Sequence, residues 1–148
     1  MILETKATTK HAKRTLTAPW DRRRLSRWRG TTDDGEEVTV LLPRGVSVRG
    51  GEVLASRGGE TVAVLAAEEE LSEAEADGAL LVARGAYHLG NRHVPLQFEG
   101  GRLRYQRDHV LDEMLRVLGF RVRGVRGGFD PEPGPYHGGH GHGGRDEP

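Results

Sequence analysis

Residues 71–126 read LSEAEADGALLVARGAYHLGNRHVPLQFEGGRLRYQRDHVLDEMLRVLGFRVRGVR, and their pattern predicts an α+β domain. It begins with a predicted strand over residues 71–76. Apolar side chains then recur at helical spacing through Val82, Ala86 and Leu89, which predicts an amphipathic helix. Asp77 is the expected N-cap of this helix. Pro95 disfavours helical geometry at the residue before it, so the helix should end near residue 92 or 93.

A hairpin follows the predicted helix. Residues 94–98 and 103–105 are expected strands, and the two glycines at 100 and 101 supply a tight turn between them. The second strand is therefore predicted to pair with the first in an antiparallel ribbon.

A second helix completes the pattern. Asp108 is its expected N-cap, and Gly119 stands where a helix commonly ends. Residues 120–125 are predicted to form the last strand. The order β-α-β-β-α-β is that of the ferredoxin-like fold. Between the cap and the glycine, apolar residues recur at helical spacing at Leu111, Met114, Leu115 and Leu118.

The first seventy residues predict a separate, small all-β domain. Short runs of β-branched residues alternate with turn signals such as Asp34-Gly35 and Gly58-Gly59, which is typical of small β modules. The chain is therefore predicted to be α+β, with an all-β domain over residues 1–70, a ferredoxin-like domain over residues 71–126 and a flexible Gly/Pro/His tail over residues 127–148. The strands expected in the first domain are residues 37–42, 46–48, 53–55 and 61–65.

The composition limits the possible functions. The 148 residues include no cysteine, which excludes disulfides, thiolate nucleophiles and thiolate metal sites. Lys and Arg number 22, as do Asp and Glu, so the formal net charge is zero. No apolar run is long enough for a membrane span, and no secretory signal is evident. We expect a cytoplasmic protein that does not bind membranes.

Histidines in the tail are the clearest candidates for chemistry. His137, His140 and His142 are separated by glycines, which allow their side chains to converge on one ion. Neutral imidazole is a good ligand for nickel, zinc, copper and iron. The alternative is an accidental, tag-like tract with no function.

Two further histidines lie at predicted helix ends. His93 falls at the C-terminal end of the first helix, where exposed carbonyls favour a cation. A two-fold dimer could bring a second His93 against the first, although a lone histidine can also be merely structural. His109 follows Asp108, the expected N-cap of the second helix. It is either a metal ligand or simply an exposed histidine in the first turn of that helix.

The N-terminal third is rich in arginine. Arg22, Arg23, Arg24, Arg27 and Arg29 lie among two tryptophans. Cations interleaved with indole rings can bind nucleic acid. The competing interpretation is a solvated strand face that balances the acidic residues of the same chain.

Three segments in the second half resemble one family. Residues 86–97 (AYHLGNRHVPLQ), 107–115 (RDHVLDEML) and 129–136 (FDPEPGPY) are similar, in order and spacing, to signatures of the urease accessory metallochaperone family, the E protein of the urease operon. The resemblance implies a homodimer that is not an enzyme. It implies delivery of Ni²⁺ to urease apoprotein together with an accessory GTPase and other accessory proteins.

The resemblance also implies roles for particular residues. His93 closes the Gly-Asn-Arg-His motif and corresponds to the interface nickel ligand of the family. His137, His140 and His142 correspond to additional tail ligands. In some members, the histidine that corresponds to His109 forms an auxiliary metal site with a second histidine two residues earlier. This chain has Arg107 at that earlier position. Residues 1–70 correspond to the domain proposed to bind polypeptide.

Two other functions are consistent with parts of the sequence. One is a nucleic-acid-binding protein that uses the arginine-rich N-terminal segment. The other is a histidine-based metal hydrolase, which would need a rigid pocket that a glycine-rich tail is poorly suited to provide. An all-imidazole ligand set also permits Zn²⁺ or Cu²⁺ in vitro, since Cu²⁺ stands above Ni²⁺ in the usual affinity order.

Overall fold

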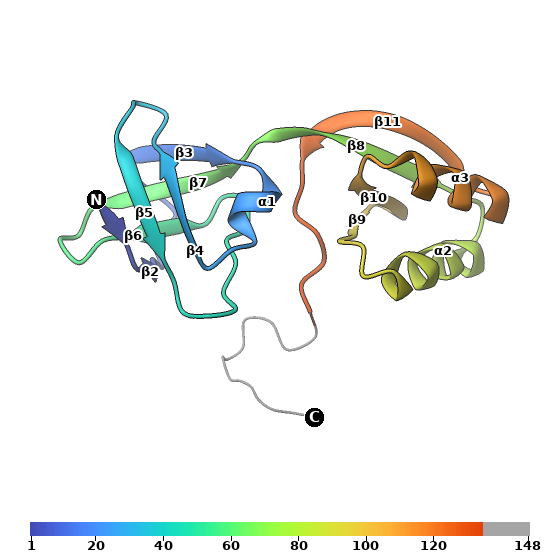
Figure 1. The fold of residues 1–148 in the computed structure, drawn as a ribbon, viewed down its shortest axis with the longest axis horizontal. Helices are drawn as coiled ribbons and strands as arrows, with labels where there is room; N and C mark the ends of the chain where they lie inside the picture. Colours follow the sequence, from blue (N-terminus) through green and yellow to red (C-terminus); the bar gives the residue numbers. More distant parts are fainter. Residues whose placement is uncertain (135–148) are drawn as a thin grey trace, which may run out of the picture. The chain divides into compact units, whose positions relative to one another are not determined.

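The structure is a computed structural model that describes residues 1–134, and in it the chain forms two compact units (Figure 1). Unit 1 comprises Met1–Glu69 and Gly127–Asp130. Unit 2 comprises Glu70–Arg126 and, of the remaining described residues, 131–134. Each unit has its own apolar core, as the sequence predicts for an all-β domain followed by an α+β domain.

Unit 1 consists of two small sheets that enclose a core. One sheet has the strand order β1-β5-β4 and the other the order β2-β6-β7-β3. Leu16, Trp28, Val40 and Val64 are among the buried residues between them. The elements are β1 (Ile2–Leu3), β2 (Thr5–Lys6), β3 (Arg14–Ala18), α1 (Trp20–Arg23), β4 (Arg27–Thr31), β5 (Glu37–Leu41), β6 (Val53–Ala55) and β7 (Thr61–Ala66).

The strands predicted over residues 37–42, 53–55 and 61–65 are confirmed as β5, β6 and β7. The strand predicted over residues 46–48 is wrong, because this segment is irregular. Val48 is nevertheless fully buried, and its N–H donates to the carbonyl of Arg23 at 2.8 Å. The alternation of Val46 and Val48 therefore reflects burial of a loop rather than pairing in a sheet.

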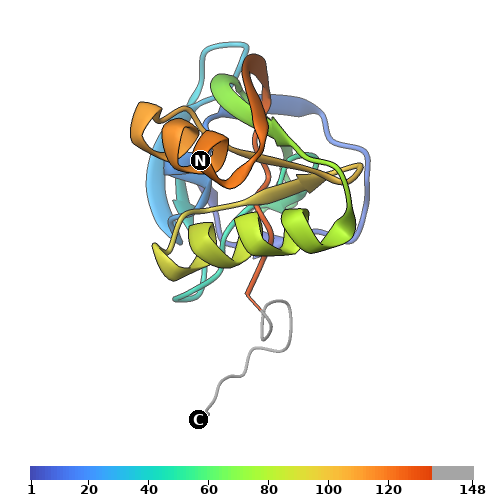
Figure 2. The same ribbon diagram turned by 90° about the vertical axis from the view of Figure 1, so that its right-hand side faces the viewer.

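Unit 2 has the predicted ferredoxin-like order β-α-β-β-α-β. Its sheet has the strand order β11-β8-β10-β9. Both helices lie on one face of this sheet (Figure 2), where Leu89, Leu103, Leu115 and Phe120 form part of the core. The elements are β8 (Glu68–Glu75), α2 (Ala79–Asn91), β9 (Gln97–Glu99), β10 (Arg102–Gln106), α3 (His109–Leu118) and β11 (Arg121–Gly128).

The turn and cap residues of unit 2 follow the sequence predictions with one exception. Gly100 and Gly101 form the two-residue turn between β9 and β10, both with positive φ. Asp108 caps α3 by accepting from two backbone N–H groups of its first turn. Asp77 does not cap α2; Gly78 precedes the first helical residue, at φ 91°, a conformation that glycine adopts readily. The Asp77 carboxylate instead accepts from the Arg121 guanidinium at 3.4 Å.

Residues 127–130, predicted as the start of a flexible tail, belong instead to the folded unit 1. β11 runs to Gly128, and Phe129 is fully buried in unit 1. The Asp130 carboxylate accepts from Arg23 at 2.7 Å and from the N–H of Gly50 at 3.0 Å. These contacts connect residues far apart in sequence, so the local Gly/Pro content could not reveal them.

Candidate metal site

His93 occupies an unusual backbone position at the end of α2. Its N–H donates to the carbonyl of Gly90 at 2.9 Å, and the N–H of Val94 donates to the carbonyl of Leu89 at 3.1 Å. This pair of hydrogen bonds defines a Schellman motif, in which the residue after the helix adopts the left-handed conformation. Glycine usually takes this position, but His93 holds it here with φ 58°. It is the only residue other than glycine with positive φ among residues 1–134.

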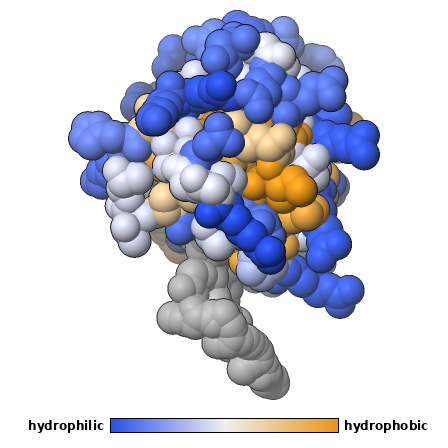
Figure 3. Space-filling view, turned by 90° about the vertical axis from the view of Figure 1, so that its left-hand side faces the viewer, coloured by the Kyte–Doolittle hydropathy of each residue, from blue (hydrophilic) through white to orange (hydrophobic). Residues whose placement is uncertain are grey.

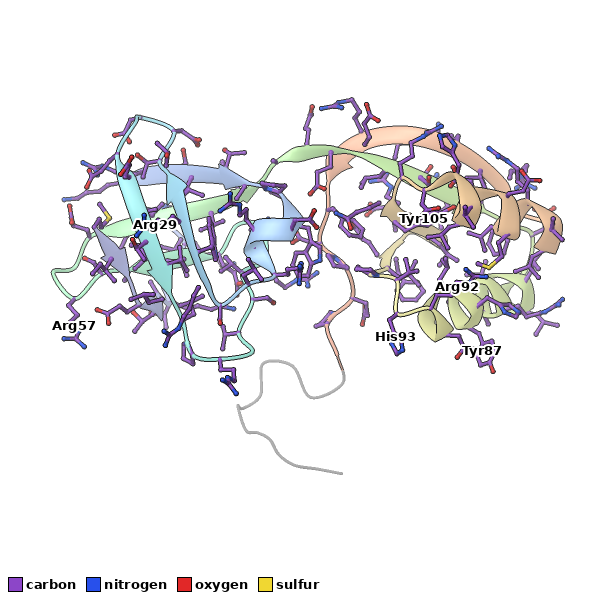
Figure 4. The ribbon with its side chains drawn as sticks, in the orientation of Figure 1. Arg29, Arg57, Tyr87, Arg92, His93 and Tyr105 are labelled. Carbon is purple, nitrogen blue, oxygen red and sulfur yellow. The ribbon has the colours of Figure 1, made fainter. Side chains whose placement is uncertain are left out.

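The left-handed turn presents the imidazole to solvent. His93 is exposed, and Figure 4 shows its side chain extending outward from the end of α2. The last carbonyls of a helix carry partial negative charge, so a cation bound there is favoured. The geometry therefore suits a ligand that must be reached by an incoming or departing metal ion.

Residues 131–134 pass close to the segment that follows His93. The N–H of Glu132 donates to the carbonyl of Leu96 at 2.6 Å, and Pro131 is buried. Leu96 is three residues after His93, so the chain enters its last segment next to the candidate ligand. His137, His140 and His142 lie outside the described residues.

His93 is not part of a complete metal site in the described part of one chain. No group of three or more His, Asp or Glu side chains suited to hold a metal occurs within residues 1–134. A tight site at His93 therefore requires ligands from a second copy, from the last fourteen residues, or from both.

His109 lies in a different environment from His93. It is exposed in the first turn of α3 and, with His88 and Glu113, lines a groove of about 600 Å³ whose other walls are apolar. His93 does not line this groove. Within residues 1–134, His109 belongs to no group of three or more side chains that could hold a metal ion.

Both helices of unit 2 expose large apolar side chains. On α2, Leu80 is 76% and Tyr87 65% exposed; on α3, Val110 is 68% and Val117 81% exposed. Tyr87 extends from the same side of α2 as His93 (Figure 4). Exposed apolar surface of this kind is typical of protein–protein contact surfaces.

Two buried polar groups support the element that carries His109. The Tyr105 hydroxyl donates to the Asp112 carboxylate at 2.7 Å, and both residues are almost fully buried. Burial and this hydrogen bond raise the pKa of Tyr105 above its ordinary value. The pair therefore joins β10 to α3 through a hydrogen bond that water cannot replace.

A carboxylate with several arginine partners stabilises the other face of the unit 2 sheet. Glu73 is only 2% exposed and forms ion pairs with Arg104 at 2.7 Å and Arg123 at 2.6 Å. Burial alone would raise the pKa of Glu73, but the hydrogen bonds from Arg123 and Arg104 outweigh it and lower the pKa. The sequence did not reveal this network, because its members come from β8, β10 and β11.

The arginine-rich segment divides into structural and exposed residues. Arg23 is fully buried and donates to the carbonyls of Ala18 at 2.9 Å and Val48 at 3.2 Å. Trp28 is buried in the core of unit 1. Neither Arg23 nor Trp28 is therefore available to a ligand, and the nucleic-acid alternative loses these two members of its cluster.

The fold and the candidate site define a class: a two-unit protein with a small all-β unit and a ferredoxin-like unit that presents a solvent-exposed histidine at a helix end. Residues 2–67 match the family described as UreE urease accessory protein, N-terminal domain, and residues 69–147 match its C-terminal domain. The chain belongs to the UreE urease accessory protein family.

Individual relatives agree with this assignment. The chain is 53% identical to a urease accessory protein UreE of Alkalilimnicola ehrlichii over 84% of this chain and 76% of the relative. It is 50% identical to that of Teredinibacter turnerae over 83% and 80% of the two chains. It is 46% identical to that of Dechloromonas aromatica over 97% and 85%. These relatives are named as accessory proteins rather than enzymes. Within residues 1–134, no helix is long and apolar enough to cross a membrane.

Proposed function

We propose that this protein is a cytoplasmic nickel metallochaperone that donates Ni²⁺ to urease apoprotein, with an accessory GTPase, and that it catalyses no reaction itself. Its membership of the urease accessory protein family supports a role in urease maturation. The nickel-binding part of the proposal depends on His93. Its imidazole is exposed to solvent and lies at the electronegative C-terminal end of α2. Nickel is the cargo of this protein, so exposure is required for loading and release.

The proposed nickel site is shared by two copies of the chain. One imidazole rarely holds a metal ion tightly, and a two-fold axis near His93 would bring its counterpart from the second copy against it. The exposed apolar side chains of α2 and α3, such as Tyr87 and Val117, supply a surface for such contact. Residues 71–126 would then both dimerise and bind metal.

The tail histidines complete the proposed coordination. Glu132 is held beside Leu96, and His137 follows five residues later. An extended chain covers about 3.3–3.6 Å per residue, so five residues span at most ~18 Å. His137 is therefore within reach of His93 on the same copy. Ordering a glycine-linked segment costs entropy, so we propose that His137, His140 and His142 bind more weakly than the His93 pair.

His109 is proposed to contribute a weaker metal site at most. It lacks a second histidine at residue 107, and the groove it lines is largely apolar. Imidazole ligands alone do not select Ni²⁺ against Cu²⁺ or Zn²⁺. Selectivity is therefore proposed to depend on coordination number and on the protein that receives the ion.

Nickel transfer tests this function directly. The purified protein, loaded with Ni²⁺, should activate urease apoprotein in the presence of its other accessory proteins and GTP. The variant His93→Gly should fail to do so at equal total nickel, while Arg57→Gln, which removes an exposed charge in unit 1, should activate like the parent. Equal activation by His93→Gly would contradict the proposal.

A further inference from the structure

An apolar groove lies between α2 and the edge of the unit 2 sheet. β9 is the edge strand, and the register places its Phe98 opposite Leu103, whose side chain is in the core. Phe98 therefore lies on the side of the sheet that faces the helices, yet it is 50% exposed. The groove has a volume of about 700 Å³, and its walls come from Phe98 and from short side chains of α2, namely Ala79, Val82, Ala83 and Ala86.

The walls of this groove are more uniformly apolar than those of the other depressions. None of the described residues that line it has a polar side chain. The groove beside His109 also includes His88 and Glu113. Unit 1 exposes apolar residues too, gathered within a mostly hydrophilic surface (Figure 3), but the depression on its β1-β5-β4 sheet is lined by charged residues such as Arg29 and Glu37. The groove between α2 and β9 therefore suits an uncharged, flat side chain.

The C-terminal segment of the same chain begins beside this groove. The N–H of Glu132 donates to the carbonyl of Leu96 at 2.6 Å, and Pro131 is buried. Leu96 directly precedes β9, and Phe98 is two residues further on, or ~7 Å along an extended strand. Residues 131–134 and the groove belong to the same unit. Fourteen residues, 135–148, follow from a point close to one wall of the groove.

The C-terminal sequence offers one side chain that fits the groove. Residues 131–148 read PEPGPYHGGHGHGGRDEP, in which Tyr136 is the only large apolar side chain. Prolines at 133 and 135 favour an extended backbone at the residues before them. Four extended residues span at most ~14 Å, which exceeds the distance from Leu96 to Phe98, so Tyr136 can reach the groove from Glu132. Tyrosine also suits a groove that opens to solvent, because its ring is apolar and its hydroxyl can stay in water.

We propose that the groove between α2 and β9 binds the Tyr136 ring of the same chain. The ring packs against Phe98 and over the methyl groups of Ala83 and Ala86. Ala86 lies two helical turns, or ~10 Å, before His93. Docking of Tyr136 therefore holds the next residue, His137, on unit 2 near His93. The docking needs no metal, and only its consequence for the tail ligands rests on the proposed nickel function.

NMR spectroscopy of the full-length protein in EDTA tests the docking. With isotopically labelled alanine methyl groups, Ala83 and Ala86 should show NOEs to a tyrosine ring that are absent from Tyr136→Ala. The comparison removes any contribution of Tyr87, which is adjacent to Ala86 in the sequence. A mixed sample identifies the chain that supplies the ring: labelled Tyr136→Ala is refolded together with unlabelled parent, and the Tyr136-dependent NOEs should not appear.

Chymotrypsin gives a second readout, because it cleaves after a tyrosine only where the chain is accessible. Ala83→Glu places a carboxylate in the groove while keeping a good helix former, so it should speed cleavage after Tyr136 at least about fivefold. The matched control Arg84→Glu introduces the same carboxylate at an exposed position of α2 that does not line the groove. It should be cleaved within about twofold of the parent rate.

Three results would overturn the proposal. One is the absence of Tyr136-dependent NOEs at both methyl groups of the parent. Another is their appearance in the mixed sample, which would assign the groove to the tail of a second copy. The third is equal cleavage of Ala83→Glu and the parent. None of these measurements involves nickel, so failure here is distinguishable from failure of the proposed nickel function.

Discussion

Replacing His93 by glycine should stabilise the protein while removing the proposed nickel ligand. A left-handed conformation costs an L-residue roughly 1–2 kcal/mol, and His93 adopts it at φ 58°. Glycine avoids this strain, but it also makes the unfolded chain more flexible, which lowers the free energy of unfolding by about 0.4–1 kcal/mol. The expected net gain in the free energy of unfolding of unit 2 is therefore ~1 kcal/mol.

Alanine provides the matched control. His93→Ala also removes the imidazole, but it keeps a Cβ in the left-handed region, so its stability should stay within about 0.5 kcal/mol of the parent. The two variants therefore lose the same ligand and differ in backbone strain.

Hydrogen exchange of the α2 amides, measured with EDTA present, gives the required readout. Protection in His93→Gly should increase about fivefold, which corresponds to ~1 kcal/mol. Both tryptophans lie in unit 1, so their fluorescence should report unchanged unfolding there and serves as an internal control. If the glycine variant is no more stable than the parent, or if alanine stabilises equally, the strain assigned to His93 is wrong.

Three further variants test interactions that stabilise unit 2. Tyr105→Phe should lower the free energy of unfolding by about 1–3 kcal/mol, measured by urea denaturation, because the buried Asp112 carboxylate loses its donor. Gly85→Ala should destabilise by ~1–3 kcal/mol in the same assay, since a Cβ would lie 2.7 Å from a ring carbon of Phe120. The pKa of Glu73 is lowered from its ordinary value of 4.5, so its ion pairs stabilise the fold at any pH above 4.5. This stabilisation is lost as the pH falls through the lower pKa of the folded state. Glu73→Gln should therefore unfold more easily at pH 7 and show a weaker loss of stability below about pH 4.5, as followed by circular dichroism.

The sequence predicted unit 2 well because its signals are local. The two-glycine hairpin turn, the Asp108 cap and the apolar spacing of α3 each depend on a few neighbouring residues. Asp77 failed as a cap because Gly78 could adopt positive φ and begin the helix without a side-chain acceptor.

The features that were missed depend on contacts between distant segments. β3 pairs in parallel with β7, more than forty residues later, and no local pattern indicates that pairing. Arg23 resembles its exposed neighbours in sequence but is buried among carbonyls of Ala18, Val48 and Phe129. The left-handed turn at His93 is also invisible locally, because glycine, the usual signal for it, is absent. His93 could be proposed as a ligand from the sequence, while its left-handed backbone conformation could not be predicted.

Calorimetric titration with Ni²⁺ at one pH decides whether His93 is the primary nickel ligand. It compares the full-length protein with His93→Gly and with a triple variant in which His137, His140 and His142 are replaced by alanine. The parent should show a tight event at one ion per two chains, which weakens in acid because imidazole must be neutral to bind metal. His93→Gly should lose that event, and the triple variant should keep it with lower capacity or affinity. If the triple variant loses all nickel binding while His93→Gly binds like the parent, the primary site is in residues 137–142 and His93 is not the main ligand.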